Sequence, residues 1–550
     1  MKFRFIVFVV LLVVAAGPAS SRVTAADPVV KTFMVSMRDG ARLATDVYLP
    51  SDDKPVPVLL MRTPYGKSWP AASARMLSAN GYAVVLQETR GRFASEGANI
   101  PFDADGWLEK QDGYDTLEWI AVQSWCKGKI GMYAGSAMGI AQILVACTGT
   151  QKLTCLNIGY AIPKLYNMVY VNGLFRQSII EGWLKENKYA PEALTIWTSH
   201  PTYDEYWRKR DATLRFNKVN VPALHVGGWY DLFAQGTIDT FVGFQTKGGN
   251  NARGKQKLFM SPYPHTNDEQ LSEVAFPHAD DLSNALDFTS HYIPGDFPWF
   301  EHYLKDVDNG VEQKTPAVTY YVMGDVTDPY APGNCWRSAD TWPPFGTRQT
   351  PIYLHSDLTL GMEKNSLEST LAYDYDPNNP VPTIGGPQYF LLAGPRDQRK
   401  IESRADILVF TSDPLEKPLE ITGRVSARLW ASTDAPDTDF FVRLCDVYPD
   451  GRSIGICEGG RRVRLRNSLS REESVKPGIP YAFDIDMWST SIIINKGHRL
   501  RIHVTSSCAP GYIPNANTGS YPYSKTMRIA HNTVYLGKSR PSCVILPVPK

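Results

Sequence analysis

The sequence has almost no net charge, and this excludes one large class of partners. Its 550 residues carry 57 Lys and Arg against 56 Asp and Glu, a formal net charge of +1. A protein that binds nucleic acid needs a clustered surplus of basic residues to neutralise phosphates. With 43% apolar residues the chain is also unlike a disordered protein. The composition predicts a globular protein that binds no nucleic acid.

Metal-ligand spacing is also missing. No group of cysteines and histidines is spaced like the ligands of a zinc site, so we expect neither a metal nor another cofactor. The eight cysteines could form disulfides in an exported protein, but sequence cannot choose among the pairings. Cys445 and Cys457 flank a turn at 449–452. A two-residue turn would put Cys445 opposite Ile456 and the two thiols on opposite faces, and a one-residue bulge would reverse that.

Long apolar runs are scarce as well. Crossing a bilayer takes about 20 consecutive apolar residues, and no run reaches that length, so no stable membrane span is expected. The N-terminus is a separate case. Lys2 and Arg4 precede an apolar run at residues 5–16, and small residues continue to Ala26. This pattern is typical of a secretory signal peptide, residues 1–26, and predicts a secreted or periplasmic protein.

Three patterns follow one another along the rest of the chain. In residues 27–162 and 218–345, short apolar runs alternate with helical patterns, which is typical of a parallel α/β sheet. Residues 163–217 mix aromatic and charged side chains, and we interpret them as a helical cap. Residues 346–550 contain many short strands between Pro, Gly, Asp and Asn turns, which predicts a jelly-roll β-sandwich.

The segment 131–139 (GMYAGSAMG) is the first candidate for chemistry. A strand leads into a tight turn of small residues that carries Ser136, and a helix follows. A nucleophilic serine sits on such a strained turn, where the start of the helix offers N–H groups to an oxyanion. The strict G-x-S-x-G pattern is not met, because Ala134 and Met138 occupy the glycine positions. A turn serine without a catalytic role therefore stays an alternative.

A base and an orienting acid are predicted downstream. The strand at 221–226 leads to a predicted glycine turn at 227–228 and then to Asp231. The strand at 257–264 is followed directly by His265. In α/β-hydrolases the order along the chain is Ser, then Asp or Glu, then His, each after a strand. Asp231 could instead be an ordinary turn residue, but its position and that of His265 fit this order.

Other histidines compete for the role of base. His225 lies inside an apolar strand and is expected to be a core residue. His302 belongs to an amphipathic helix. His498 and His503 fall in the β-rich part of the chain, and His278 and His291 lie in a long loop. None of them follows a strand of the predicted sheet as His265 does.

Beyond this pattern, the chain resembles the cocaine-esterase-type α/β-hydrolases (CocE/NonD family), which are related to X-Pro dipeptidyl-peptidases, glutaryl acylases and α-amino-acid ester hydrolases. The resemblance covers nearly all of the mature chain and rests on several motifs in the right order. They are RTPYGK (62–67), QETRGRFASEG (87–97), DGYD (112–115), GKIGMY before Ser136, GGWYD (227–231), PH (264–265), TSDPL (411–415), KGHRLR (496–501) and NANTG (515–519).

The resemblance implies roles for five residues. Ser136 would be the nucleophile, His265 the base and Asp231 the carboxylate that orients it. Tyr65 would supply a hydroxyl to the oxyanion hole, and Ala137 would supply its backbone N–H. Family members usually carry Gly two positions before the serine and Tyr just after it, where this chain has Ala. The smaller Ala137 side chain puts substrate preference in doubt more than activity.

Two further features have both a structural and a functional interpretation. Arg90 and Glu96 lie in one Arg-Gly-Arg turn and could pair as a structural clamp or contact substrate. We favour the clamp. The aromatic residues of the cap could line an acyl pocket, or they could simply pack the cap helices together.

The predicted protein is a secreted serine hydrolase that cleaves carboxylic esters or amides of small molecules through an acyl-enzyme. An X-Pro dipeptidyl-peptidase or amino-acid ester hydrolase would need an acidic site for a substrate ammonium group. Residues 232–235 offer no carboxylate, but Glu181, Glu186 or Asp204 of the cap could serve. A secreted binding protein, with a lectin-like sandwich on a hydrolase relic, is the alternative from another class. The oligomeric state is not predicted.

Overall fold

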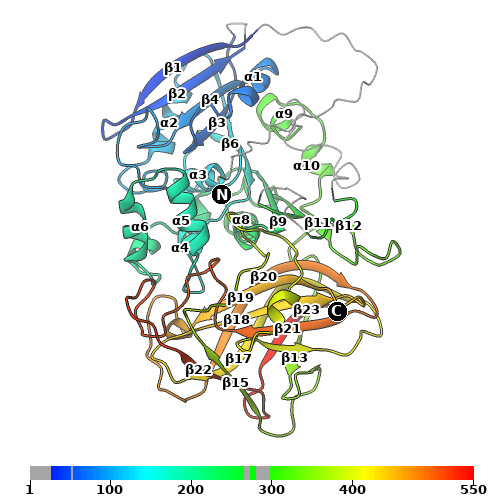
Figure 1. Ribbon diagram of the computed structural model, residues 1–550. Helices are drawn as coiled ribbons and strands as arrows, with labels where there is room; N and C mark the ends of the chain where they lie inside the picture. The colour runs from blue at the N-terminus through cyan, green and yellow to red at the C-terminus, as the bar shows by residue number, and fades with distance from the viewer. Residues whose placement is uncertain (1–26, 51–53, 266–272, 280–297) are drawn as a thin grey trace.

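The computed structural model describes residues 27–50, 54–265, 273–279 and 298–550 (Figure 1). The signal peptide predicted for residues 1–26 lies outside the described residues and stays a prediction. His291 also lies outside them. An α/β core, blue to green in Figure 1, lies above a β-sandwich coloured yellow to red. No helix in the described ranges is long and apolar enough to cross a lipid bilayer.

The α/β core is organised around one sheet of ten strands. From β4 to β11 the neighbouring strands are parallel, while β1, β2 and β12 extend the two edges antiparallel. The central strands are buried along most of their length, as in sheets covered on both faces. In spatial order the strands are β1 (Val29–Ser36), β2 (Arg42–Leu49), β4 (Ala83–Glu88), β3 (Val56–Thr63), β5 (Cys126–Met132), β6 (Leu153–Gly159), β9 (Ala223–Tyr230), β10 (Lys257–Pro264), β11 (Val318–Val322) and β12 (Cys335–Ala339).

Helices cover this sheet, and one of them is buried completely. Every residue of α3 is buried, because its sequence AMGIAQILVA is apolar on all sides apart from one glutamine. The other helices of the core bury one face only, for example α9 through Trp299, Phe300 and Leu304. The core helices are α1 (Ala71–Ala79), α2 (Asp112–Ala121), α3 (Ala137–Ala146), α8 (Ala234–Lys247), α9 (Pro298–Lys305) and α10 (Val311–Lys314).

A helical insertion separates β6 from β9, and we call it the cap. Several of its aromatic rings pack against one another: the Tyr166 ring lies 5.3 Å from that of Tyr170 and 5.7 Å from that of Trp207. Helix packing thus accounts for these rings. The cap contains α4 (Leu165–Val169), β7 (Tyr170–Val171), β8 (Leu174–Phe175), α5 (Gln177–Glu186), α6 (Pro191–Thr198), α7 (Glu205–Arg208) and the 3₁₀ turns η1 (Ala212–Leu214) and η2 (Phe216–Lys218).

The C-terminal part is a sandwich of two antiparallel sheets, which confirms the predicted fold class. One sheet contains β14 (Leu360–Gly361), β13 (Thr347–Leu354), β23 (Cys543–Pro549), β17 (Leu419–Thr433), β22 (Ala530–Tyr535) and β15 (Thr370–Tyr375), with β20 (Tyr481–Ile494) also paired to β17. The other contains β16 (Leu408–Thr411), β21 (Arg499–Thr505), β18 (Asp439–Val447) and β19 (Ser453–Arg462); helix α11 (Arg399–Glu402) and the turn η5 (Val463–Leu465) lie in the connections.

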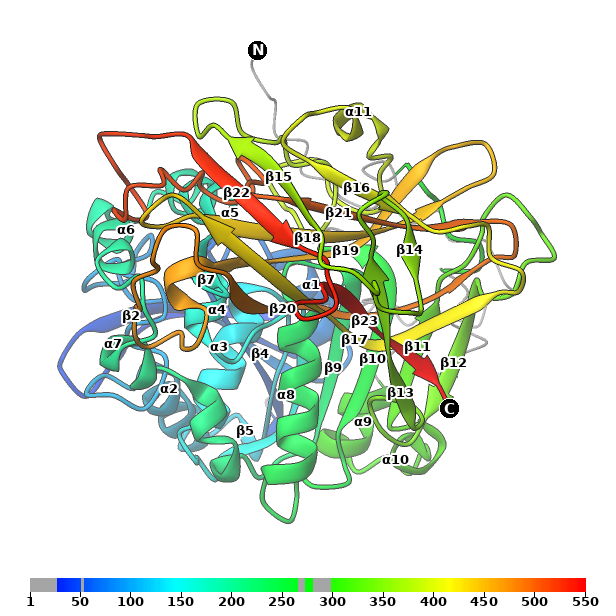
Figure 2. The same cartoon turned by 90° about the horizontal axis from the view of Figure 1, so that it is seen from below.

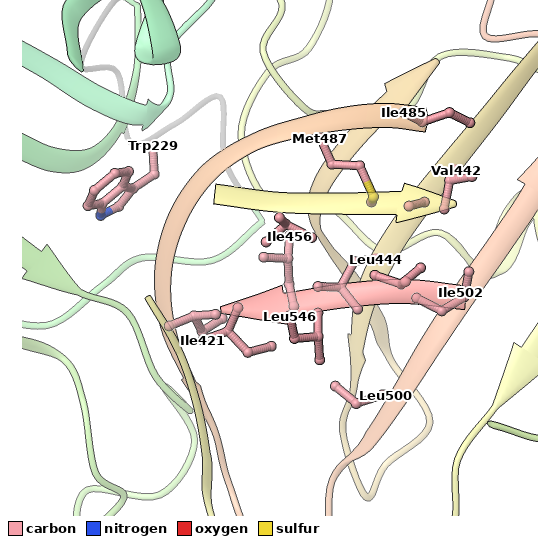
Figure 3. Close-up of a cluster of buried hydrophobic side chains, with 14 of the residues drawn as sticks. Trp229, Ile421, Val442, Leu444, Ile456, Ile485, Met487, Leu500, Ile502 and Leu546 are labelled. Carbon is pink, nitrogen blue, oxygen red and sulfur yellow. The ribbon is translucent and has the colours of Figure 1, made fainter. Parts of the chain in front are cut away.

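The sandwich and the α/β core share one apolar interior. Figure 3 shows Trp229 of β9 together with sandwich residues such as Ile421 and Ile456, and all three belong to one buried cluster. Backbone hydrogen bonds join Met323, just after β11, to β20. In the view from below, the sandwich strands cross the core near α8 and β11 (Figure 2). The sandwich is therefore fixed against the part of the core that carries the site described next.

All eight cysteines are in the described residues, and all are free. The β18–β19 hairpin contains the bulge that the sequence left open, so the expected pairing of Cys445 with Ile456 is wrong. Cys445 instead lies opposite Gly455, while Cys457 lies opposite Leu444. The two cysteines are still not paired with each other, because the bulge shifts the register on one side of Leu444 only.

Candidate active site

Ser136 lies on a strained turn between β5 and α3. Its backbone has φ 61° and ψ −130°, and Ala134 also has a positive φ, 99°. Such conformations are costly for residues other than glycine and persist only where the surroundings enforce them. Here the Ser136 N–H donates to the Gly159 carbonyl at 2.9 Å, and Gln142 Nε2 donates to the Ala134 carbonyl at 2.7 Å. The turn therefore projects the Ser136 side chain from the end of the sheet.

Small residues are required at this turn because β6 passes close by. A Cβ atom on Gly139 would lie 2.7 Å from the Gly159 carbonyl oxygen and 2.9 Å from Ala161 Cβ. One on Gly135 would lie 2.9 Å from the same carbonyl. These glycines allow α3 to start directly above the strand. Ala134 is evidently small enough to take the place of glycine.

Asp231 follows β9 and is fully buried. The turn predicted at 227–228 is wrong, because both glycines lie inside the strand. Their role is close packing: a Cβ on Gly228 would lie 2.1 Å from the Tyr263 carbonyl oxygen of β10. Asp231 Oδ1 accepts the Phe233 N–H at 2.6 Å, which fixes the carboxylate and leaves Oδ2 for a second partner.

His265 comes directly after β10 and connects the two other residues. Its Nδ1 is hydrogen-bonded to Asp231 Oδ2, and its Nε2 lies 2.9 Å from Ser136 Oγ. Because a carboxylate can only accept, Nδ1 carries the proton and Nε2 is free to accept the serine proton. The structure thus brings together the three residues predicted from separate strand ends.

Three aromatic rings surround the imidazole of His265 edge-on. The ring centroids of Tyr160, Phe233 and Tyr389 lie 5.7, 5.8 and 5.3 Å from it. Tyr160 follows β6 and Phe233 follows Asp231, but Tyr389 comes from the C-terminal part, between β15 and β16. The rings limit the water around His265, and the sandwich part contributes directly to this site.

The predicted oxyanion-hole groups lie next to the serine. Ala137 is the first residue of α3, so its N–H has no acceptor within the helix. The Tyr65 hydroxyl accepts the indole N–H of Trp183 at 3.0 Å. Burial raises the pKa of Tyr65 to about 12, although hydrogen bonds with Trp183 and Ser136 oppose the shift. Tyr65 is therefore a neutral phenol that can donate one hydrogen bond.

The rival histidines are engaged elsewhere. His225 is buried in β9 with Nε2 3.1 Å from Gln256 Oε1, and burial lowers its pKa to about 4. His302 contacts the Val307 carbonyl and Glu312. His498 and His503 are held by carboxylates inside the sandwich. None of these four shares a contact with Ser136.

The proposed clamp exists, but with different partners. Arg90 does not pair with Glu96; its guanidinium bonds Asp112 at 2.6 and 2.9 Å and Asp39 at 2.8 and 3.0 Å. Glu96 pairs with Arg42 instead. The predicted pairing with Glu96 is wrong because the two carboxylates that bind Arg90 come from other segments of the chain, which the sequence of the turn does not specify. The structural role of Arg90 holds.

A small pocket lies beside the serine turn. Ala137, Pro64 and Phe102 form part of its wall, and Asp105 and Asp112 line it as well. Both carboxylates are already paired, Asp105 with the buried Arg62 and Asp112 with Arg90. The pocket therefore offers an apolar wall and no unpaired carboxylate.

Sequence reasoning missed several residues that complete the site. Trp183, Phe233 and Tyr389 contact Tyr65 or His265, and the buried Arg176 donates to the carbonyl of Leu232, next to Asp231. The only signal for Trp183 was the aromatic composition of the cap. For Tyr389 and Arg176 the sequence contained no signal, since their positions depend on how cap and sandwich pack on the core.

Comparisons with known proteins agree with this architecture. The family model of X-Pro dipeptidyl-peptidase (S15 family) matches residues 39–192 and 177–267, and that of the X-Pro dipeptidyl-peptidase C-terminal non-catalytic domain matches 309–545. Cocaine esterase from Rhodococcus sp. (strain MB1 Bresler) is 33% identical over 95% of this chain and 99% of the relative. The chain belongs to the S15 family of cocaine-esterase-type serine hydrolases.

Solved structures share the fold of this S15 hydrolase. An α-amino acid ester hydrolase superposes with a TM-score of 0.79 at 23% identity, covering 98% of this chain and 100% of the other. An aminopeptidase from a marine sediment archaeon, Thaumarchaeota archaeon, gives 0.78 at 21% identity over 98% and 99%. The family description calls the C-terminal domain non-catalytic, yet in this hydrolase it carries Tyr389, whose ring contacts His265.

Proposed function

We propose that this hydrolase cleaves carboxylic esters with Ser136 as nucleophile, His265 as general base and Asp231 as the residue that orients it. His265 Nε2 takes the proton from Ser136 Oγ as the oxygen attacks the substrate carbonyl. Tyr65 O–H and the Ala137 N–H donate to the oxyanion that forms. His265 then passes its proton to the leaving alcohol, and a water molecule, activated in the same way, releases the acid from the acyl-enzyme.

One observation carries the proposal: the continuous contact from Asp231 through His265 to Ser136, with 2.9 Å between Nε2 and Oγ. A nucleophile and base within hydrogen-bonding distance, with the base oriented by a third group, are what nucleophilic catalysis requires. The strained backbone of Ser136 supports it, because such strain persists mainly at functional sites.

The surroundings favour an ester over an Xaa-Pro peptide. A dipeptidyl-peptidase must bind the ammonium group of its substrate. Two of the three cap carboxylates considered for this task are engaged, while Glu186 has no hydrogen bond or ion pair among the described residues. Glu181 accepts the Tyr523 hydroxyl at 2.6 Å, and Asp204 caps α7 and bonds His200. Asp105 and Asp112 at the pocket are paired with arginines. The aromatic rings around His265 instead suit an apolar acyl group.

A small substrate panel tests this function. Hydrolysis of phenyl acetate, phenyl benzoate and Gly-Pro-anilide is measured for the wild type and for Ser136→Ala. We expect kcat/KM for the phenyl esters to exceed that for Gly-Pro-anilide by at least about 100-fold, and Ser136→Ala to abolish both ester activities. A preference for Gly-Pro-anilide would overturn the ester assignment, and full turnover by Ser136→Ala would overturn the nucleophile.

A further inference from the structure

Trp183 connects the cap to the proposed oxyanion hole. It lies on α5, and its Nε1–H donates to the Tyr65 hydroxyl oxygen at 3.0 Å. An indole N–H can only donate, so Tyr65 uses an oxygen lone pair for this bond and directs its own proton elsewhere. Ser136 also lies near Tyr65, where a hydrogen bond from it would lower the pKa of the phenol. The bond from Trp183 therefore leaves the phenol proton for the side of the site where the serine lies.

The indole of Trp183 is held in one orientation by rings from three segments. It stacks with Phe102 of the core, 5.8 Å away at an interplanar angle of 8°, and with Trp197 of α6, 6.5 Å away at 1°. Tyr189 packs at 4.8 Å with a tilt of 43°. Stacking fixes both ring torsions and hence the direction of the N–H.

The sandwich part also constrains the helix that carries Trp183. The neighbouring residue, Gly182, has no room for a side chain, because a Cβ there would lie 2.8 Å from the Phe390 ring. Tyr523 reaches the same helix through its hydrogen bond to Glu181. The position of the indole N–H thus depends on the core, the cap and the C-terminal part together.

We propose that Trp183 is a positioning residue: its N–H orients and polarises the Tyr65 hydroxyl toward the oxyanion. The inference rests on the proposed function, in which Tyr65 donates to the oxyanion. When charge develops there, Tyr65 donates one hydrogen bond while accepting another from Trp183. Two hydrogen bonds in the same direction polarise each other, so the phenol becomes a stronger donor. If Trp183 only formed part of the pocket wall, its replacement would instead affect substrate binding.

The test begins with Trp183→Phe, which keeps an aromatic ring and removes the N–H. We expect kcat for phenyl acetate to fall about three- to tenfold, the equivalent of one hydrogen bond, with KM changed less than about twofold. Trp197→Phe is the matched control, because it makes the same substitution in the neighbouring ring, keeps an aromatic ring against Trp183 and leaves the bond from Trp183 to Tyr65 in place. It should leave kcat within about twofold of the wild type, and thermal melts should show both variants folded.

A double-mutant cycle with Tyr65→Phe decides the question. Without the phenol there is no proton to orient, so Trp183→Phe should lower kcat no further in that background. If Trp183→Phe costs the same factor in both backgrounds, or acts through KM alone, it is a pocket wall and the inference fails. If Tyr65→Phe itself leaves kcat unchanged, the oxyanion hole of the proposed function is wrong, and the inference falls with it.

Discussion

Two buried histidines in this protein each have a carboxylate on Nδ1, and they differ in what faces Nε2. In the candidate site, His265 lies between Asp231 and Ser136 Oγ. At the junction of sandwich and core, His498 lies between two carboxylates, with Nδ1 2.8 Å from Asp446 and Nε2 3.1 Å from Asp325. The side chains are 8% and 1% exposed.

The second partner decides what such a histidine can do. A hydroxyl that faces Nε2 can give its proton to the ring, so His265 can act as the base for the Ser136 hydroxyl beside it. A second carboxylate favours the charged ring instead. Burial alone would lower the pKa of His498, but hydrogen bonds and charges from Asp446 and Asp325 outweigh it and raise the pKa. Because both ring nitrogens face carboxylate oxygens, His498 can donate to both of them as a cation that joins β18, the turn before β21 and the segment after β11.

Removing each imidazole gives the largest expected contrast. His265→Ala should lower kcat for a phenyl ester by at least about 10⁴-fold, because the serine loses its base. His498→Ala, assayed where it is folded, should keep kcat within a few-fold of the wild type. Steady-state assays beside thermal melts measure both. Comparable kcat losses in the two variants would break the distinction.

Neutralising the Nδ1 carboxylates sharpens the comparison. Asp231→Asn should lower kcat by about 10³- to 10⁴-fold, because an amide can stabilise the wrong tautomer of His265. Asp446→Asn should affect stability rather than turnover, since His498 keeps Asp325. The same assays and melts separate the effects. A loss of turnover in folded Asp446→Asn would contradict the assignment.

His498→Gln should destabilise the protein by about 3–5 kcal/mol, because Asp446 and Asp325 would remain buried without a cation. The matched control is His531→Gln. His531 has the same 2.8 Å contact with a carboxylate, Asp374, but its side chain is 60% exposed, and such pairs contribute only about 0–1 kcal/mol. Urea unfolding curves of the three proteins give the comparison. Equal losses in the two variants would refute the role of burial.

The smallest expected effect is the pH dependence of the stability that His498→Gln loses. Because the folded-state pKa of His498 is raised, its stabilisation is fully present below the unfolded pKa of about 6.5 and is lost as pH rises through the folded value. Tyr448, whose ring packs at a tilt against His498 with 4.4 Å between centroids, and Asn495, bonded to Asp325, also face the group. The difference in melting temperature between wild type and His498→Gln should therefore shrink from pH 6 to pH 9. A difference that grows with pH would contradict the charge assignment.

The sequence predicted the parts of the site that are encoded locally. Ser136, Asp231 and His265 each follow a strand, and a parallel sheet brings its strand ends to one edge, so their meeting was predictable from order alone. Trp183, Tyr389 and the true partners of Arg90 were not, because their contacts depend on packing between segments that are far apart in the chain. Likewise, Gly227 and Gly228 suggested a turn, but the structure needs them for close contact between β9 and β10.

The most direct test of the account is covalent labelling with a fluorophosphonate, followed by mapping of the modified peptide. We predict that Ser136 is the labelled residue, that ester turnover falls in proportion to the fraction of Ser136 that is labelled, and that His265→Ala slows labelling as strongly as it slows turnover. His498→Gln, where folded, should label at the wild-type rate. A label on a different serine, or turnover that survives complete labelling of Ser136, would contradict the account.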